Sequence, residues 1–312
     1  MIELVFNEIS LEKPAKSLQQ ASNAIQDMFS IADEVVKLHQ QKVSILAKIF
    51  FNAISLSEDY TFQQWLTSLP KELKQRYLNY ITKSPIIQEY PEYHFRGTEC
   101  QGGFAYACQN DLATISYDPY SEWAEIKYLI TKNSLEELED DTEVVSEDLE
   151  VLHIPNASMV FKFEIFFRNK IQFTQNKNFS NLKNIQDFWD NRETLLPNLH
   201  FCECVNEQIQ VFSIDGKDFG IIFNKLSILN EYYAHNKEKY PKDLGLNFSS
   251  ESESTLNQYS QERIFQLPNG ENQLFTLHIK LNSHRVYFHF EKVTQKCYIG
   301  YIGKHLRTVK YN

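Results

Sequence analysis

Three short segments near the C-terminal end of the chain alternate apolar with polar residues, and they constrain the fold more than any other feature. In residues 274–281 the apolar positions are Phe275, Leu277, Ile279 and Leu281. The same alternation runs through residues 285–291 and returns in residues 297–302. A period of two is typical of β-strands, because successive side chains point to opposite faces of the pleat. The breaks between the segments are short, so we expect an antiparallel sheet over residues 273–302.

One face of this predicted sheet carries an unusual set of side chains. The polar positions are His278, Lys280, Arg285, Tyr287 and His289. If the aliphatic positions share a core, these five lie together on the opposite face, since neighbouring strands are about 4.8 Å apart. A solvated sheet face is one interpretation. Five donors or titratable groups against one acid, Glu291, favour a functional face instead.

Charge is divided unevenly along the chain. Residues 256–312 hold eight Lys and Arg against three Glu, a net charge of +5, and four of the nine histidines. The whole chain of 312 residues carries −10, so the first 255 residues carry −15. This split predicts an anionic partner for the C-terminal end. The alternative is that the basic end docks on the acidic body of the same protein.

Helix and strand patterns alternate through the rest of the chain. We expect strands at residues 2–6, 112–117, 124–130 and 159–167, and helices at 16–40, 61–82 with a break at Pro70, from an N-cap at Ser180 through Trp189, and at 218–234. Ser250 and Glu253 fit a capping box for a further helix through Leu256 and Tyr259. The predicted fold class is therefore α+β, with helical N-terminal and middle regions and a C-terminal antiparallel β-sheet unit.

Residues 135–150 contain nine acids and are expected to form an exposed loop or linker, because such a run repels itself. This predicts an N-terminal α+β domain over residues 1–134 and an acidic linker or loop over 135–150. A mainly helical middle region follows over 151–248, and the basic sheet unit covers 249–312.

The five cysteines are odd in number and irregularly spaced, which favours reduced thiols in the cytoplasm. The sequence shows no signal peptide and no apolar run of roughly 20 residues, so we expect a soluble cytoplasmic protein without a membrane partner. His200, Cys202 and Cys204 would share one face of a strand, but a structural zinc site needs a fourth ligand. We therefore predict no metal and no other cofactor.

Two resemblances bear on function. The segment Arg285-Val-Tyr-Phe-His-Phe-Glu291, a polar turn and Ile299-Gly-Tyr-Ile-Gly-Lys-His-Leu306 together resemble the last strands of the RelE/ParE superfamily of bacterial toxins. The longer run from Ser250-Glu-Ser-Glu-Ser-Thr255 through Arg263-x-Phe265, Leu267-Pro-Asn-Gly270 and His278-x-Lys280 resembles an uncharacterised bacterial protein family associated with phage defence. The toxin resemblance covers about a fifth of the chain.

The toxin resemblance implies a metal-independent endoribonuclease, in which a ribose 2′-hydroxyl attacks the adjacent phosphorus. Lys280, Arg285 and Lys304 would stabilise the phosphate charge. The general acid and base would come from Tyr287, His278, His289 and His305. Further contacts to the nucleic acid would come from Arg263, Lys292, Lys296 and Arg307. Unlike small toxins, this chain has some 250 residues in front of the basic segment, which suggests a regulated or partnered module.

Three functions remain open at this point. The first is an effector of a bacterial defence or toxin-type system that acts on nucleic acid, RNA more than DNA. The second is a non-catalytic subunit of a defence complex that binds nucleic acid or a protein through the same face. The third is a structural interaction protein. The histidines favour the first, because binding to phosphates needs Lys and Arg but makes little use of neutral imidazoles.

Overall fold

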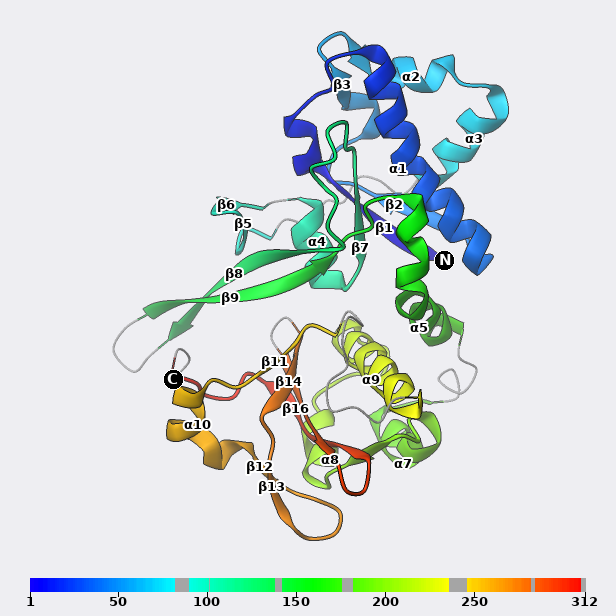
Figure 1. Cartoon of the computed structure of the whole chain (residues 1–312). Coiled ribbons are helices and arrows are strands. Elements are labelled where there is room, and N and C mark those ends of the chain that lie inside the picture. Colours follow the sequence, from blue (N-terminus) through cyan, green and yellow to red (C-terminus); the bar gives the residue numbers. More distant parts are fainter. Residues whose placement is uncertain are drawn as a thin grey trace. The chain divides into compact units, whose positions relative to one another are not determined.

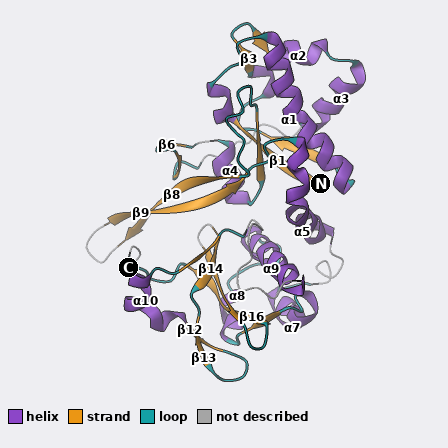
Figure 2. Cartoon of the chain, viewed as in Figure 1, coloured by secondary structure: helices purple, strands orange, loops and turns teal. Residues whose placement is uncertain are grey.

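The computed structural model describes residues 1–81, 90–100, 102–137, 142–175, 182–235, 246–281 and 284–309 (Figure 1). The chain divides into two units, Met1–Ser134 with Ser146–Phe167, and Leu135–Val145 with Arg168–Asn312. Helices and strands occur together, with an antiparallel sheet near the C-terminal end (Figure 2), which confirms the predicted α+β class. Among the residues described, no helix is both long and apolar enough to cross a membrane.

The first unit is built on a three-stranded parallel sheet. Strand β1 (Ile2–Asn7) lies between β2 (Val43–Leu46) and β7 (Ala113–Ser116), and both pairings are parallel. Parallel neighbours need a long crossover, which α1 (Leu18–His39) provides between β1 and β2. Helix α1 begins at the N-cap Ser17 and ends at Gln40, whose φ of 53° is left-handed. The sequence predicted the first strand and this helix but not their parallel pairing.

Two helices complete the aromatic core beside α1. Helices α2 (Phe62–Ser68) and α3 (Lys71–Tyr80) are separated at Pro70, as predicted. Phe29 of α1 stacks on Trp65 of α2 and on Tyr77 of α3, with ring centroids 5.6 and 4.5 Å apart. Burial of these rings holds the three helices together.

Short elements connect these parts. They are η1 (Glu8–Glu12), η2 (Phe51–Ala53), β3 (Ser55–Ser57), β4 (Tyr60–Thr61), β5 (Tyr93–Phe95), β6 (Thr98–Glu99) and α4 (Gly103–Asn110). Helix α4 packs directly on β1, since a Cβ on Gly103 would lie 1.9 Å from the backbone oxygen of Phe6. Only glycine permits this approach.

The acidic run 135–150 was predicted to be a loop, but the part of it that the structure describes is strand; residues 138–141 lie outside the described residues. Strands β8 (Lys127–Glu137) and β9 (Thr142–Leu152) are neighbours in a four-stranded sheet of order β6-β5-β8-β9. Leu149 and Val151 are buried two residues apart in the aromatic core of this unit, so one face of β9 packs on that core. Acids on β9 bond across the hairpin: Glu150 to Lys127 and Asp148 to Thr131, both at 2.8 Å. The alternation of apolar residues with acids in β9 is the pattern that indicates a strand.

A second prediction is also wrong. Residues 159–167 were expected to be a strand, but they lie in η3 (Ala157–Phe163) and α5 (Glu164–Gln175). The alternation was short, and buried Val160, Phe163 and Phe167 also fit three- and four-residue spacing. The predicted N-cap Ser180 lies outside the described residues, and α7 (Ile185–Leu195) begins after Asn184, whose side chain accepts from the backbone N–H of Asp187.

The second unit is built on a five-stranded sheet of order β10-β16-β15-β14-β11. Its strands are β10 (Leu199–Phe201), β11 (Phe248–Ser250), β14 (Leu277–Leu281), β15 (His284–Glu291) and β16 (Lys296–Lys304). Strands β11, β14, β15 and β16 pair antiparallel, as predicted for residues 273–302, and β10 adds a parallel edge. The middle region therefore contributes a strand to the C-terminal sheet.

Helices and a small hairpin surround this sheet. They are α7, α8 (Cys204–Ile209), α9 (Lys217–His235), α10 (Glu253–Tyr259), η4 (Ser260–Arg263), and the paired strands β12 (Ile264–Gln266) and β13 (Asn272–Leu274). Tyr233 of α9 stacks on Phe290 with centroids 4.9 Å apart, which places α9 on the apolar face. Helix α10 is capped by Ser252, whose oxygen accepts from the backbone N–H of Thr255, and not by the predicted Ser250.

Candidate nucleic-acid interface

The strand register brings four of the predicted site residues onto one face of the sheet. His278 lies opposite Tyr287, and Lys280 lies opposite Arg285, on the paired strands β14 and β15. On the other side of β15, Tyr287 faces Tyr301 and Arg285 faces Gly303. Side chains opposite one another in an antiparallel pair are close neighbours. The predicted grouping of these residues on one face agrees with this register.

That face is not open to solvent, so the predicted exposure is wrong. His278 is 5% exposed, Arg285 1% and Tyr287 0%. The β12–β13 hairpin covers this side of the sheet: Phe265 packs on Phe275 and on Tyr301, with ring centroids 5.2 and 6.0 Å apart. Gly300 makes this possible, since a Cβ there would lie 2.6 Å from Phe265 and 2.7 Å from Phe275. The sheet is therefore buried on both faces.

A carboxylate that the sequence interpretation missed organises the buried side chains. Glu251 follows β11, and its Oε1 accepts from Arg263 Nε at 2.8 Å and from the hydroxyl of Tyr287. His278 Nδ1 lies 3.6 Å from the same oxygen. The side chains of Glu251 and Arg263 are 5% and 0% exposed. A buried arginine requires such a partner. The acid that pairs with Arg263 is Glu251, to which the sequence analysis gave no role.

Arg263 also ties the C-terminal segment to the sheet. Its Nη1 donates to the backbone oxygen of Tyr259 at 3.2 Å, and its Nη2 donates to that of Arg307 at 2.7 Å. The predicted role of Arg263 was surface contact with nucleic acid. Its complete burial and these bonds assign it a positioning role instead, while its charge still acts on its neighbours.

Five basic side chains lie close enough to interact and define what we call the basic cluster: Arg263, His278, Lys280, Arg285 and His305. Burial, followed by the charges of Arg285, His305, Lys280 and Arg263, lowers the pKa of His278 to about 2. Burial and then the charge of Arg285 lower the pKa of His305 to about 4. Both imidazoles are therefore neutral at pH 7. The cluster holds three permanent cations and two uncharged histidines.

The proton positions in the cluster follow from the hydrogen bonds. His305 Nδ1 lies 2.6 Å from the backbone oxygen of Leu306, which can only accept, so Nδ1 carries the proton and Nε2 the lone pair. Burial raises the pKa of the Tyr287 phenol, which donates to Glu251. At neutral pH His278, His305 and Tyr287 are therefore all uncharged. The arrangement concentrates positive charge without supplying an imidazolium.

The basic residues of this region differ in their exposure to solvent. Lys280 and His305 are partly exposed, whereas Lys304 and Arg307 are exposed. Lys304 pairs with His284 in the β15–β16 register, one residue from Arg285, so it lies on the opposite face of the sheet from the cluster, and its predicted place in the site is wrong. The guanidinium of Arg307 is bonded to Glu262, with Nε 2.6 Å from Oε1. A ligand could reach Lys280 and His305 without unfolding the unit.

The remaining predicted residues lie elsewhere. His289 packs against Phe275, with ring centroids 5.7 Å apart, and pairs with Tyr298. It follows Arg285 by four residues, which is about 13 Å along a strand, so the two do not meet one phosphate. Lys292 and Lys296 are exposed at the turn beyond His289. His289, Lys292 and Lys296 therefore lie toward the β15–β16 turn, away from the basic cluster.

A second buried carboxylate lies in the first unit and was also missed. Glu8 follows β1; its Oε2 accepts from the backbone N–H of Gly103 at 2.6 Å, and its Oε1 accepts from that of Lys48. Burial raises the pKa of Glu8 despite these bonds. Nearby, Asn7 Nδ2 donates to Ser116 Oγ at 2.9 Å, which links the ends of β1 and β7. These contacts fasten α4 and β7 to the central strand.

No group of three or more His, Cys, Asp or Glu side chains that could hold a metal occurs in the described ranges. His200 packs beside Tyr298, and burial raises the pKa of Cys202 to about 12, so this thiol stays protonated. In comparisons with known proteins, no family model, curated protein or solved structure matches this chain.

Proposed function

We propose that the second unit binds the phosphate backbone of a nucleic acid at the basic cluster, with RNA preferred over DNA. The observation that carries this proposal is the shared field of Arg263, Lys280 and Arg285 at His278 and His305. Lys280 and Arg285 lie on one sheet face and Arg263 lies beside them in η4, and an anion that joins these three cations offsets their mutual repulsion. A phosphate reached through Lys280 and His305 is such an anion. The preference for RNA rests on the toxin resemblance.

Binding is favoured over cleavage because of the histidines. In-line cleavage by a 2′-hydroxyl needs a base and an acid near neutral pH. His278 and His305 are neutral, and the Tyr287 hydroxyl is bonded to Glu251, so none of them is a ready acid. A non-catalytic subunit therefore fits the geometry better than a nuclease. Its place in a defence or toxin-type system rests on the second resemblance.

Cleavage is the second candidate, and one observation favours it. Burial and then the charge of Arg285 lower the pKa of His305, whose Nε2 carries a lone pair, so a base and a phosphate-stabilising cation lie close together. A bound phosphate would also raise the pKa of both histidines. A cleaving enzyme would form a 2′,3′-cyclic phosphate end in the presence of EDTA, and His305→Asn would abolish it.

The test is a salt series with fluorescently labelled single strands. RNA and DNA of one sequence are titrated with the full chain by anisotropy between about 50 and 300 mM salt. The logarithm of the association constant should fall linearly with the logarithm of salt concentration, and Lys280→Ala should reduce the slope by about one. Lys304→Ala, on the opposite face of the sheet, should leave the slope unchanged. Lys183→Ala, an exposed lysine of the same unit, is the matched control and should leave the slope unchanged.

Two results would overturn the proposal. One is the absence of binding to either strand at about 50 mM salt. The other is binding in which Lys280→Ala behaves like Lys183→Ala, which would place the nucleic acid elsewhere. Salt-indifferent capture of a protein instead would support the alternative partner, since contacts that are largely apolar are screened little by salt.

A further inference from the structure

Two of the five side chains of the basic cluster can meet a ligand from outside. Lys280 and His305 are partly exposed, whereas Arg263, His278 and Arg285 are at most 5% exposed. The guanidinium of Arg285 is also held from within, since its Nη1 donates at 2.8 Å to the backbone oxygen of the preceding residue. Lys280 lies directly opposite Arg285 on the neighbouring strand. The surface that a ligand can touch is therefore small and suits one anionic group better than a stretch of RNA backbone.

The charges inside the cluster do not balance. The described contacts place one carboxylate there, Glu251, which pairs with Arg263. Three permanent cations and one carboxylate leave a net charge of +2, because both histidines are neutral. Buried charges interact strongly, since the protein interior screens them less than water does. An anion that brings two negative charges to one point matches this excess better than an anion that brings one.

The fixed tautomer of His305 adds a chemical requirement. Its Nδ1 donates to the backbone oxygen of Leu306 at 2.6 Å, so Nε2 can act only as an acceptor while the ring is neutral. A phosphodiester offers acceptors alone and at neutral pH has no proton to donate to Nε2. A phosphate monoester has a second pKa of about 6, so it can share a proton near neutral pH. The monoester therefore complements Nε2 as well as the Lys280 ammonium.

We propose that the basic cluster recognises the terminal phosphate of an RNA strand rather than the phosphodiesters within the strand. One phosphate oxygen accepts from Lys280, a second shares a proton with Nε2 of His305, and the field of the buried arginines favours the double charge. The inference rests on the function proposed above and names the part of the RNA that the cluster binds. A 5′ end and a 3′ end can carry the same group, so both are tested.

Matched RNA ends provide the test. Strands of one sequence with an internal fluorescent label are titrated with the full chain by anisotropy at pH 7 and about 100 mM salt. One strand has hydroxyls at both ends, one a 5′-phosphate, one a 3′-phosphate, and one a 5′-phosphate esterified with a methyl group. The methyl ester is a diester at the same position, so it lacks the second charge. At least one terminal monoester should bind about tenfold more tightly than the hydroxyl strand, and the methyl ester should not.

Two substitutions at Lys280 test the charge match in steps. Lys280→Gln lowers the net charge of the cluster by one, and Lys280→Glu lowers it by two, to zero. The preference for the terminal phosphate should shrink in the first variant and vanish in the second. Because Lys280 is partly exposed, neither change should unfold the unit, and the Tm of each variant checks this.

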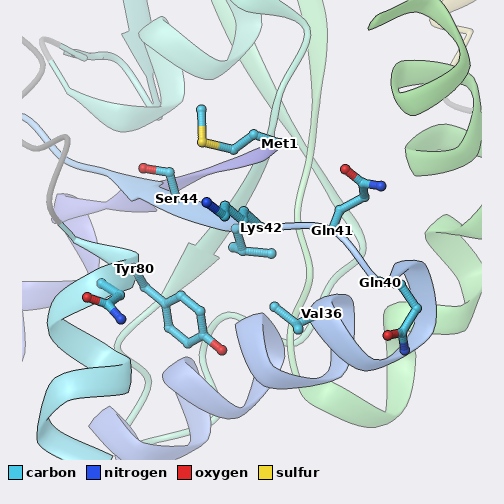
Figure 3. Close-up of a pocket in the computed structure, with 9 residues that line it drawn as sticks. Met1, Val36, Gln40, Gln41, Lys42, Ser44 and Tyr80 are labelled. Carbon is cyan, nitrogen blue, oxygen red and sulfur yellow. The ribbon is translucent and has the colours of Figure 1, made fainter. Parts of the chain in front are cut away.

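Two other lysines serve as controls. Lys304 precedes His305 in the chain but lies on the opposite face of the sheet, so Lys304→Ala removes the same charge without touching the site. Lys42 belongs to the first unit, where it lines an open cavity together with Tyr80 (Figure 3). Lys42→Ala tests whether that cavity holds the terminal phosphate instead of the cluster. Both variants should keep the full preference for the terminal phosphate.

A preference that falls in steps at Lys280 and survives both control substitutions supports the proposal. Equal binding of all the strands overturns it, and if the salt slope still depends on Lys280, the binding function of the cluster stands without it. A preference that Lys280→Glu leaves intact, or that Lys42→Ala removes, places the terminal phosphate elsewhere and also overturns the proposal. If no strand binds even at about 50 mM salt, the proposed function and this inference both fail.

Discussion

Arg263 and Glu251 form an ion pair that is sealed inside the second unit. Nε lies 2.8 Å from Oε1, and the two side chains are 0% and 5% exposed. Each partner has further bonds, Arg263 to two backbone oxygens and Glu251 to the Tyr287 hydroxyl. These bonds join strand β15, the η4 turn and the C-terminal segment. The pair thus holds in place the segment that carries His305.

The first prediction is that loss of one partner destabilises the second unit strongly. Glu251→Ala leaves a buried guanidinium without its carboxylate and should lower the free energy of unfolding by about 3–5 kcal/mol. The double variant Glu251→Leu with Arg263→Met should cost less than Glu251→Ala alone, because no charge stays buried. Urea unfolding measures both.

The exposed pair of Lys37 and Glu34 is the control for this prediction. Its atoms are 3.0 Å apart, but the lysine side chain is 73% exposed. Glu34→Ala should change the free energy of unfolding by less than about 1 kcal/mol. Similar costs for Glu34→Ala and Glu251→Ala would contradict the role assigned to the buried pair.

The second prediction concerns acid. Burial lowers the pKa of His153 to about 3 and that of His278 to about 2, below the ordinary value of 6.5. The unfolded chain therefore binds protons that the folded chain does not. Stability is fully present above the unfolded pKa and is lost as the pH falls. Between about pH 6 and pH 4 each histidine should remove up to about 1.4 kcal/mol per pH unit.

Urea unfolding at several pH values checks this dependence. His278→Gln should flatten it for the second unit, and His153→Gln should flatten it for the first, since glutamine does not titrate. NMR titration of the unsubstituted protein is an independent measurement. An imidazole that becomes charged near pH 6 in the folded protein would refute the assignment for that residue.

Local patterns were sufficient for much of this fold. The alternation in residues 274–302 predicted β14, β15 and β16, and the apolar spacing in residues 16–40 predicted α1. The parallel sheet of the first unit could not be predicted in this way. Strand β1 pairs with β7 more than 100 residues later, and no short-range pattern specifies such a partner. The acidic strand β9 was missed because its charges outweighed its alternation.

The site shows a different limit of sequence analysis. Alternation placed Arg285 and Tyr287 on the polar face, but a polar face is usually taken to be wet. Here a covering hairpin and Glu251 allow arginine and histidine to be buried. Gly300 and Phe265 were the available signals, since a strand glycine can indicate close approach of another side chain. Pairing Arg263 with Glu251 requires the fold.

The third prediction tests how the hairpin covers the sheet. Gly300→Ala places a Cβ within 2.6 Å of Phe265 and should lower the free energy of unfolding by about 1–3 kcal/mol through overpacking. In a Phe265→Ala background the same substitution should cost less, because one of the two rings is gone. Urea unfolding of the four proteins gives this coupling directly. Equal costs in the two backgrounds would show that Phe265 does not cover Gly300.

The last prediction links the proposed phosphate site to the protonation of His305. The charges of Arg285, Arg263 and Lys280 help burial to lower its pKa to about 4. A phosphate bound among these cations offsets their field, so the pKa of His305 should rise and binding should take up protons. Affinity for single-stranded RNA should therefore increase as the pH falls from about 6.5 to 5. Calorimetry at pH 5.5 in buffers of different ionisation enthalpy counts the protons, and His305→Asn should reduce the uptake while retaining binding.

His284→Asn is the matched control. This histidine precedes Arg285 on β15, so it lies on the opposite face of the sheet from the basic cluster. Proton uptake that is unchanged in His305→Asn would show that the RNA does not bind beside this residue.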